Sequence, residues 1–140
     1  MALHLVKMAV GVGDFAELRR LQKQRRKERG RYCFFTRNMP RRVEEVLDGG
    51  SIYWVIKGHV QARQRLLRFT PMIEEEDGRR YVAVEYDKEL VPVLWQPKRP
   101  FQGWRYLEPR HAPPDRAIAA AGNDDLPTEM AAELRSLGLL

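Results

Sequence analysis

Aromatic and basic side chains are interleaved in two stretches of the sequence, and these are the residues best suited to chemistry. Tyr53 and Trp54 are followed closely by Lys57, and Trp104 stands directly before Arg105. Nucleobases stack on aromatic rings, while arginine and lysine bind phosphate groups. A single tryptophan is more often a core residue, but Trp104 lies in a loop-like stretch after a glycine. We therefore expect the chain to bind a nucleobase, with Trp104 as the leading stacking ring.

A base that is turned out of a nucleic acid needs three kinds of partner: an aromatic face, polar groups for the base edge, and cations for the flanking phosphates. The sequence supplies candidates of all three kinds. For stacking they are Tyr53, Trp54 and Trp104; for the base edge Thr36, Asn38 and Gln102; for phosphate or carbonyl groups Lys7, Arg37, Arg42 and Arg105. We expect a binding site here and no catalytic residue.

The positive charge of the chain is concentrated in one segment. The net charge of the 140 residues is +6, whereas residues 19–31 alone carry eight basic residues against one acidic residue, which gives +7. A patch of one sign favours a polyanionic partner. The alternative is a solvated helix face that only keeps the protein in solution. We expect contacts with a nucleic-acid backbone, RNA before DNA, from Arg19, Arg20, Lys23, Arg25, Arg26, Lys27, Arg29 and Arg31.

Other chemistries find little support. The histidines, His4, His59 and His111, are far apart and do not show metal-ligand spacing. Cys33 is the one cysteine, so it forms no internal disulfide, and it lies in an apolar stretch where a thiol is usually inert. No phosphate-binding glycine loop or nucleophile elbow is present. We expect neither metal nor cofactor.

Hydropathy and the N-terminus bear on location. No apolar run approaches the roughly 20 residues that a membrane helix needs. The first residues lack the basic segment, apolar core and cleavage site of a secretory signal. We therefore expect a cytoplasmic protein that does not associate with a membrane, and the oligomeric state stays open.

The stretch 48–58 is the element that should position the candidate site. Two glycines, Gly49 and Gly50, precede an almost continuous run of β-branched and aromatic residues that ends at Gly58. Such a run between glycines predicts a strand that is buried on both faces. Because side chains alternate along a strand, Tyr53 and Trp54 should point to opposite faces, so that one can face a pocket while the other packs in the core.

The remaining elements follow from periodicity and from capping signals. Asp14 and Glu17 form a capping-box-like helix start, and Gly30 is a natural C-cap. We expect the 59–69 stretch to form a hairpin with the central strand, bulged near Gln64 and ended by Pro71, although it also fits a helix. The other expected elements are strands at 3–10, 32–36, 80–86 and 90–95, and helices at 14–30, 41–47 and 127–137.

This order predicts an α+β fold with a mostly antiparallel sheet. Residues 1–112 should form the domain, and residues 113–140 should form a linker and a short C-terminal amphipathic helix. That helix leaves open a further function, in which the chain is a protein-interaction module.

Four motifs stand out along the chain: His4-Leu5-Val6-Lys7, the segment from Thr36 to Arg42, the segment from Asp48 to Gly58, and the segment from Arg99 to Pro109. Together they resemble a bacterial domain-of-unknown-function family that is common in alphaproteobacteria. The similarity covers roughly residues 3–115. The family implies no activity.

Four features follow one another along the chain: the Leu-Val-Lys strand, the acidic helix start, the Arg37-Asn38 segment and the apolar strand 50–56. Their order is similar to that of the EVE domain of the PUA-like superfamily. This resemblance implies a small β-barrel flanked by helices, with a pocket for modified bases. The related ASCH branch includes amidohydrolases that use lysine, threonine and glutamate. It leaves open a hydrolase of modified nucleosides in which Lys7, Thr36 and Glu85 act.

Overall fold

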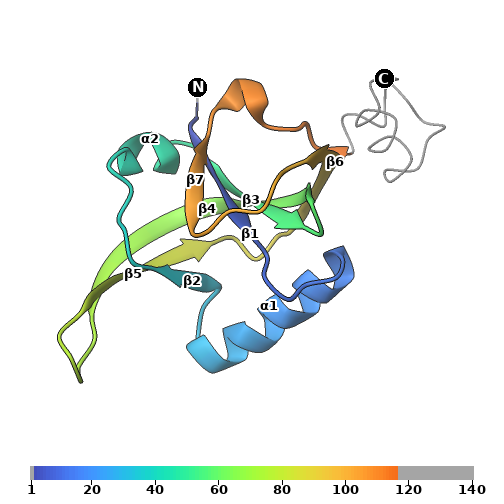
Figure 1. The fold of residues 1–140 in the computed structure, drawn as a ribbon. Helices are drawn as coiled ribbons and strands as arrows, with labels where there is room; N and C mark the ends of the chain where they lie inside the picture. The colour runs from blue at the N-terminus through green and yellow to red at the C-terminus, as the bar shows by residue number, and fades with distance from the viewer. Residues whose placement is uncertain (1, 117–140) are drawn as a thin grey trace.

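The computed structural model describes residues 2–116, which form an α+β fold made mostly of strands (Figure 1). Within these residues, seven strands build one mixed sheet, and two α-helices and a short 3-10 helix accompany it. The strands are β1 (His4–Met8), β2 (Cys33–Thr36), β3 (Ser51–Ile56), β4 (His59–Ile73), β5 (Arg80–Tyr86), β6 (Val91–Pro97) and β7 (Trp104–Leu107). The helices are α1 (Phe15–Arg29), α2 (Val43–Leu47) and η1 (Pro109–His111).

The central strand is β3, and all of its residues are buried. It pairs in parallel with β1 and antiparallel with β4, so both of its edges are satisfied. One face of β3 packs Ile52, Trp54 and Ile56 into the larger core, and the other packs Tyr53 and Val55 into a smaller core. The predicted strand with two buried faces is therefore confirmed.

Glycine corners fix both ends of β3. Gly49 has a φ of 88°, which favours glycine. At Gly50 an added Cβ would overlap the carbonyl oxygens of Leu3 and Val46, so no side chain fits. At the other end Lys57 and Gly58 both have positive φ, 46° and 81°. Positive φ at both central residues is typical of the two-residue turn that matches the twist of a β-hairpin. This turn reverses the chain, so that β4 runs antiparallel beside β3.

The strand β4 is longer than expected and has three neighbours. Its first half pairs with β3 on one side and β6 on the other, and its second half pairs with β5. The strand is bulged, as expected, but its register shifts at Gln61 and at Leu67, three residues to either side of Gln64. Pro71 does not end the strand, because it pairs with Val82 of β5. In this half β5 is the one neighbour of β4 among the described strands, so the other edge of β4 is open. The N–H that proline lacks would point to this open edge, where no strand would accept it.

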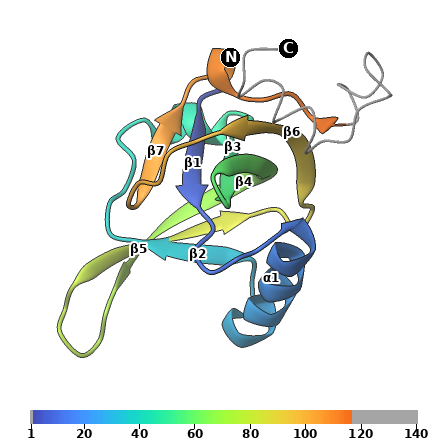
Figure 2. The same ribbon diagram turned by 45° about the vertical axis from the view of Figure 1, so that its right-hand side comes forward.

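The sheet is not a closed barrel, which corrects the expected barrel. Its order is β2-β5-β4-β3-β1-β7, with β6 attached beside β4. Closure would need a pairing between the two end strands, and β2 and β7 each have four residues and a single partner. The β4–β5 hairpin extends away from the body in both views (Figures 1 and 2). All strand pairs except β1–β3 are antiparallel, as expected.

The helix α1 begins and ends where the sequence predicts. The Asp14 carboxylate accepts a hydrogen bond from the Glu17 backbone N–H at 2.8 Å, and Gly30 closes the helix at a φ of 78°. Leu18 and Gln22 are its buried side chains. The helix lies beneath β2 in both views, at the end of the molecule away from β7 and η1 (Figure 2).

The chain after η1 returns to the sheet. Asp115 forms a bridge with Val93 of β6, and its carboxylate receives two hydrogen bonds of 2.6 Å from the Arg63 guanidinium. Residues 113–116 therefore contact the sheet. Most of the predicted linker and the predicted helix at 127–137 lie outside the described residues. In the part that is described, no helix has the length and hydropathy to cross a membrane.

Candidate nucleic-acid interface

A hollow of about 460 Å³ lies between the segment that follows β2 and the start of β7. We call it the Trp104 hollow. It collects five of the ten residues that the sequence predicts for the ligand site. Its lining residues are Thr36, Asn38, Met39, Arg41, Gln102, Gly103, Trp104, Arg105 and Tyr106. Segments more than 60 residues apart in the chain thus build one site that combines an aromatic ring, amide groups and arginines.

Hydrogen bonds hold the aromatic wall of this hollow against the segment after β2. The Trp104 Nε1–H donates to the Asn38 carbonyl oxygen at 3.3 Å. The Tyr106 ring meets the Trp104 ring edge to face, with centroids 5.0 Å apart, and its hydroxyl accepts from the Arg42 backbone N–H at 3.1 Å. Trp104 is half-buried. Its ring is therefore fixed in orientation and still accessible, as a stacking platform requires.

Lys7 lies beside this wall. In the strand register it is the direct neighbour of Trp54 on β3 and of Trp104 on β7, and its Nζ lies 5.7 Å from the centre of the Phe34 ring. Burial lowers the pKa of the Lys7 amine, and the nearby Arg25 lowers it further. Among residues 2–116, no carboxylate forms an ion pair with it. A half-buried ammonium group without a counter-ion favours an anionic partner.

Two of the expected stacking residues are not accessible. Tyr53 is 4% exposed and Trp54 is 5% exposed. Trp54 packs edge to face on Phe34 and Tyr86, and its Nε1–H donates to Gln64 at 2.9 Å. The expectation that one of the pair faces a pocket is wrong, because strands cover both edges of β3 and a core covers each of its faces.

The remaining arginines of the predicted set surround the hollow without all lining it. Arg42 is held by Glu45 through hydrogen bonds of 2.5 and 2.9 Å, and its guanidinium lies 5.7 Å from the Tyr106 ring. Arg37 lines a neighbouring hollow of about 390 Å³, which shares Thr36 with the first. Arg105 lines the Trp104 hollow and is exposed.

The basic segment places all eight of its cations at the surface. Some of them are engaged: Arg31 pairs with Glu85 at 2.7 Å, Arg20 with Glu17 at 4.0 Å, and Arg29 donates to the Cys33 carbonyl at 2.7 Å. Within the described residues no carboxylate pairs with the others, which are Arg19, Lys23, Arg25, Arg26 and Lys27. These cations give α1 a positive surface.

The residues considered for a hydrolase do not meet. Thr36 and Phe34 share a face of β2, and the Lys7 amine lies over the Phe34 ring. Glu85 stands opposite Cys33, so its side chain projects from the other face of the sheet. There it pairs with Arg31 at 2.7 Å and with Arg68 at 3.7 Å. The geometry offers no Lys-Thr-Glu site.

Histidines and acidic residues build no metal site in the described part of the chain, where no cluster of three or more such side chains occurs. His4 has a structural position instead. Its Nδ1 accepts a hydrogen bond from the Ser51 backbone N–H at 3.0 Å, and its ring packs edge to face on Tyr53 at 5.1 Å.

Four lining residues were not among the predicted site residues: Met39, Arg41, Gly103 and Tyr106. A signal exists for Tyr106, because it stands two positions after Trp104 in a strand and so shares its face. Met39 and Arg41 lie in an irregular segment, where sequence periodicity does not predict which way a side chain points. Only their nearness to Asn38 points to them.

A family model described as "Protein of unknown function (DUF1489)" matches residues 5–140. The match covers nearly the whole chain, and the protein therefore belongs to this family. A search of curated proteins found no match. A search of solved structures found none either.

Proposed function

We propose that this protein is a nucleic-acid-binding module that prefers RNA to DNA and holds one base against Trp104. The observation that carries the proposal is the Trp104 hollow itself. It combines a fixed indole ring, the side chains of Thr36, Asn38 and Gln102, and an exposed arginine at Arg105. Single-stranded RNA presents unstacked bases to surfaces of this kind.

Lys7 connects the hollow with the basic helix. It pairs with Trp104 across β1 and β7, and the charge of Arg25 on α1 is close enough to lower the pKa of its amine. A nucleic-acid strand with a base on Trp104 can therefore place its backbone phosphates along α1. The cations of α1 would supply affinity that does not depend on sequence, and the hollow would supply selection of the base.

The base would be read by its edge and by its stacking face. The Trp104 N–H already donates to the Asn38 carbonyl, so the hydrogen bonds to the base edge would come from the side chains of Asn38, Gln102 and Thr36. Amide groups both donate and accept hydrogen bonds, which suits the mixed edge of a base. We propose a modified base as the preferred ligand.

We also propose that the fold is a PUA-like, EVE-like variant in which the sheet stays open. Support comes from the order of elements: a Leu-Val-Lys strand, a helix with an acidic start, an Arg-Asn segment before α2, and an apolar central strand. We propose a bacterial protein of the cytoplasm.

Salt-dependent binding tests the proposal. Fluorescence anisotropy of labelled single-stranded RNA and DNA of equal sequence is measured between about 50 and 200 mM salt. The test variant replaces Lys23, Arg25, Arg26 and Lys27 by glutamine. The control replaces four exposed cations elsewhere, which are Arg79, Arg80, Lys88 and Arg110.

We expect RNA affinity to fall steeply with salt. The logarithmic salt slope of the α1 variant should decrease by about 1 for each replaced cation that binds a phosphate in the wild type. The control variant should retain the wild-type slope. No binding of either nucleic acid, or equal slopes for the two variants, would contradict the proposal.

A further inference from the structure

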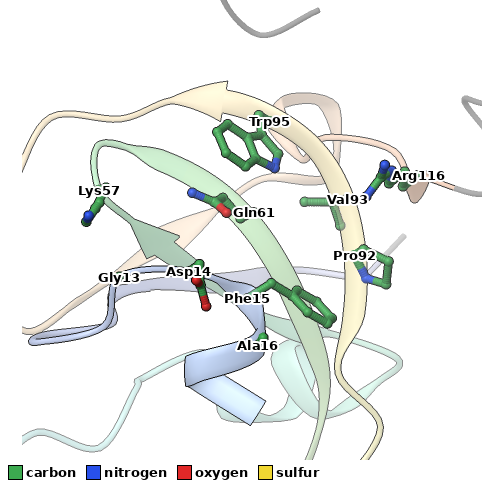
Figure 3. A pocket seen from close by; sticks show the side chains of 10 residues that line it. All are labelled: Gly13, Asp14, Phe15, Ala16, Lys57, Gln61, Pro92, Val93, Trp95 and Arg116. Carbon is green, nitrogen blue, oxygen red and sulfur yellow. The ribbon is translucent and has the colours of Figure 1, made fainter. Parts of the chain in front are cut away.

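A second and larger hollow, of about 840 Å³, lies at the start of α1 (Figure 3). We call it the Gln61 hollow. It is bounded by the first turn of α1, the Lys57–Gly58 turn and β6, and it shares no lining residue with the Trp104 hollow. Its lining residues are Gly13, Asp14, Phe15, Ala16, Lys57, Gln61, Pro92, Val93, Trp95 and Arg116. Its size falls within the range of small-molecule sites.

Gln61 is the unusual residue of this hollow. It is the extra residue of the bulge in β4, and bulges redirect side chains from the sheet. Gln61 is only 4% exposed. Its Nε2 donates to the Ile56 carbonyl at 2.8 Å, while its Oε1 has no hydrogen-bond partner in residues 2–116. Figure 3 shows the amide group directed into the hollow. Buried acceptors are nearly always paired with protein or water, so this oxygen is available to accept a hydrogen bond from a ligand that enters the hollow.

Aromatic rings provide the walls. Trp95 lines one side of the hollow and Phe15 lies on the α1 side (Figure 3). The Trp95 ring is braced by His59, with centroids 5.5 Å apart. The Arg19 guanidinium lies 5.0 Å from the centre of the Phe15 ring. Both rings are thus supported by a neighbour and are suited to contact a flat ligand.

The charges at the rim favour an anion. Lys57 lies over the start of α1, with its Nζ 3.8 Å from the position that a Cβ at Gly13 would take. Arg116 lies across the hollow from Lys57 (Figure 3). Asp14 is the one acidic residue among the described residues that line the hollow, and its carboxylate accepts the Glu17 backbone N–H at 2.8 Å. Lys57 and Arg116 against Asp14 leave this lining with a net charge of +1.

We propose that the Gln61 hollow binds a heteroaromatic base that carries a terminal phosphate. The ring would lie against Trp95, a ring N–H or amino group would donate to the Gln61 Oε1, and the phosphate would pair with Lys57. This chemistry has two sources, a free mononucleotide or the phosphorylated end of a nucleic-acid strand. The inference does not require the Trp104 hollow, because the residues that carry it are separate.

Calorimetric titration with nucleoside monophosphates tests this site. Nucleosides serve as the ring without the phosphate, and inorganic phosphate serves as the group without the ring. The main variant is Lys57→Asn, because asparagine tolerates the positive φ at this position. Gln61→Leu is the second variant, and Lys88→Asn, at an exposed site outside both hollows, is the matched control.

We expect at least one monophosphate to bind more tightly than its nucleoside or phosphate alone. Lys57→Asn and Gln61→Leu should each weaken that binding by roughly tenfold, while Lys88→Asn should leave it unchanged. Failure of every monophosphate to bind, or equal affinity in wild type and Lys57→Asn, would overturn the inference. The loss caused by Lys57→Asn should persist in a Trp104→Ala background, which separates this site from the proposed base pocket.

Oligonucleotides distinguish the two sources of the ligand. A strand phosphorylated at one end is compared with the same strand bearing a hydroxyl there. If the natural ligand is a strand end, the phosphorylated strand should bind more tightly than the mononucleotide, and Lys57→Asn should remove the difference between the two strands. If it is a free nucleotide, the mononucleotide should bind at least as tightly as the strand.

Discussion

Gln22 and Gln64, which are 42 residues apart in the sequence, exchange two side-chain hydrogen bonds of 2.8 Å inside the protein. The Gln64 oxygen also accepts from the Trp54 Nε1–H at 2.9 Å, and its amide donates to the Asp87 carbonyl at 3.0 Å. Gln64 is fully buried and Gln22 is 3% exposed. This pair therefore ties α1 to β4 and fixes the position of the basic helix relative to the sheet.

Loss of Gln64 should cost more stability than loss of Gln22. Gln64→Leu leaves the Gln22 amide, the Trp54 N–H and the Asp87 carbonyl without partners, whereas Gln22→Leu removes one partner. Because a buried polar group left unpaired costs about 1–3 kcal/mol, we expect Gln64→Leu to lower the free energy of unfolding by at least about 2 kcal/mol. Urea denaturation of the wild type and of both single variants measures this difference in the free energy of unfolding.

The double variant Gln22→Leu/Gln64→Leu should be more stable than the sum of the single losses predicts, with a coupling of about 0.5–3 kcal/mol. Gln24→Leu, at an exposed position of the same helix, is the control, and its effect should stay within about 0.5 kcal/mol. Strict additivity of the two buried changes would show that the glutamines do not act as a pair.

Much of the fold could be predicted from local signals. The apolar run between glycines identifies β3, and Asp14 and Gly30 mark the ends of α1, because backbone conformation and capping depend on nearby residues. The open sheet, the course of β4 through Pro71 and the buried Gln22 could not be predicted in this way. Each depends on which strand lies beside which, and that is decided by packing across the whole chain.

The candidate site, too, could be predicted from the sequence only in part. Thr36, Asn38, Gln102, Trp104 and Arg105 were identified by residue type and do come together. Tyr53 and Trp54 have the same chemical character but are buried, and residue type alone does not distinguish an accessible ring from a core ring. The Gln61 hollow was missed because its key residue owes its direction to a bulge.

Acid should destabilise the fold through His4. Burial, and secondarily the charge of Arg63, lowers the pKa of the His4 imidazole below the 6.5 of an unperturbed histidine. The unfolded chain therefore binds the proton more readily than the folded chain. The stability contributed by neutral His4 is complete above pH 6.5 and decreases as the pH falls from there toward the lowered folded pKa.

We expect the free energy of unfolding to decrease as the pH falls below 6.5, and to decrease less in His4→Asn. Asparagine retains an acceptor for the Ser51 N–H and does not titrate. His111→Asn, at an exposed position, is the control. Chemical denaturation at each pH measures the effect, and an identical pH dependence in wild type and His4→Asn would contradict this role.

The charge of Lys7 should lower the stability of the fold while it raises the affinity for RNA. Its half-buried ammonium group has no counter-ion among the described residues, and burial lowers its pKa. Lys7→Met retains the length of the side chain and removes the charge. We expect the free energy of unfolding to rise by about 0.5–1 kcal/mol and RNA affinity to fall.

Thermal unfolding and RNA titration of the same Lys7→Met sample measure both effects. Lys88→Met, at an exposed position, should change stability by less than about 0.5 kcal/mol and leave RNA binding unchanged. A Lys7→Met protein that is less stable and binds RNA as well as wild type would show that Lys7 is a structural residue.

The most direct test of the base pocket is a capture experiment with nuclease digests of cellular RNA and DNA, in which mass spectrometry identifies the bound nucleotides. Lys57→Asn protein is used throughout, so that the Gln61 hollow does not contribute, and it is compared with Lys57→Asn/Trp104→Ala after circular dichroism has shown that both are folded. We predict enrichment of one nucleotide from RNA, with a modified base, that disappears when Trp104 is replaced. Equal enrichment in the two proteins, or none in either, would contradict a base held against Trp104.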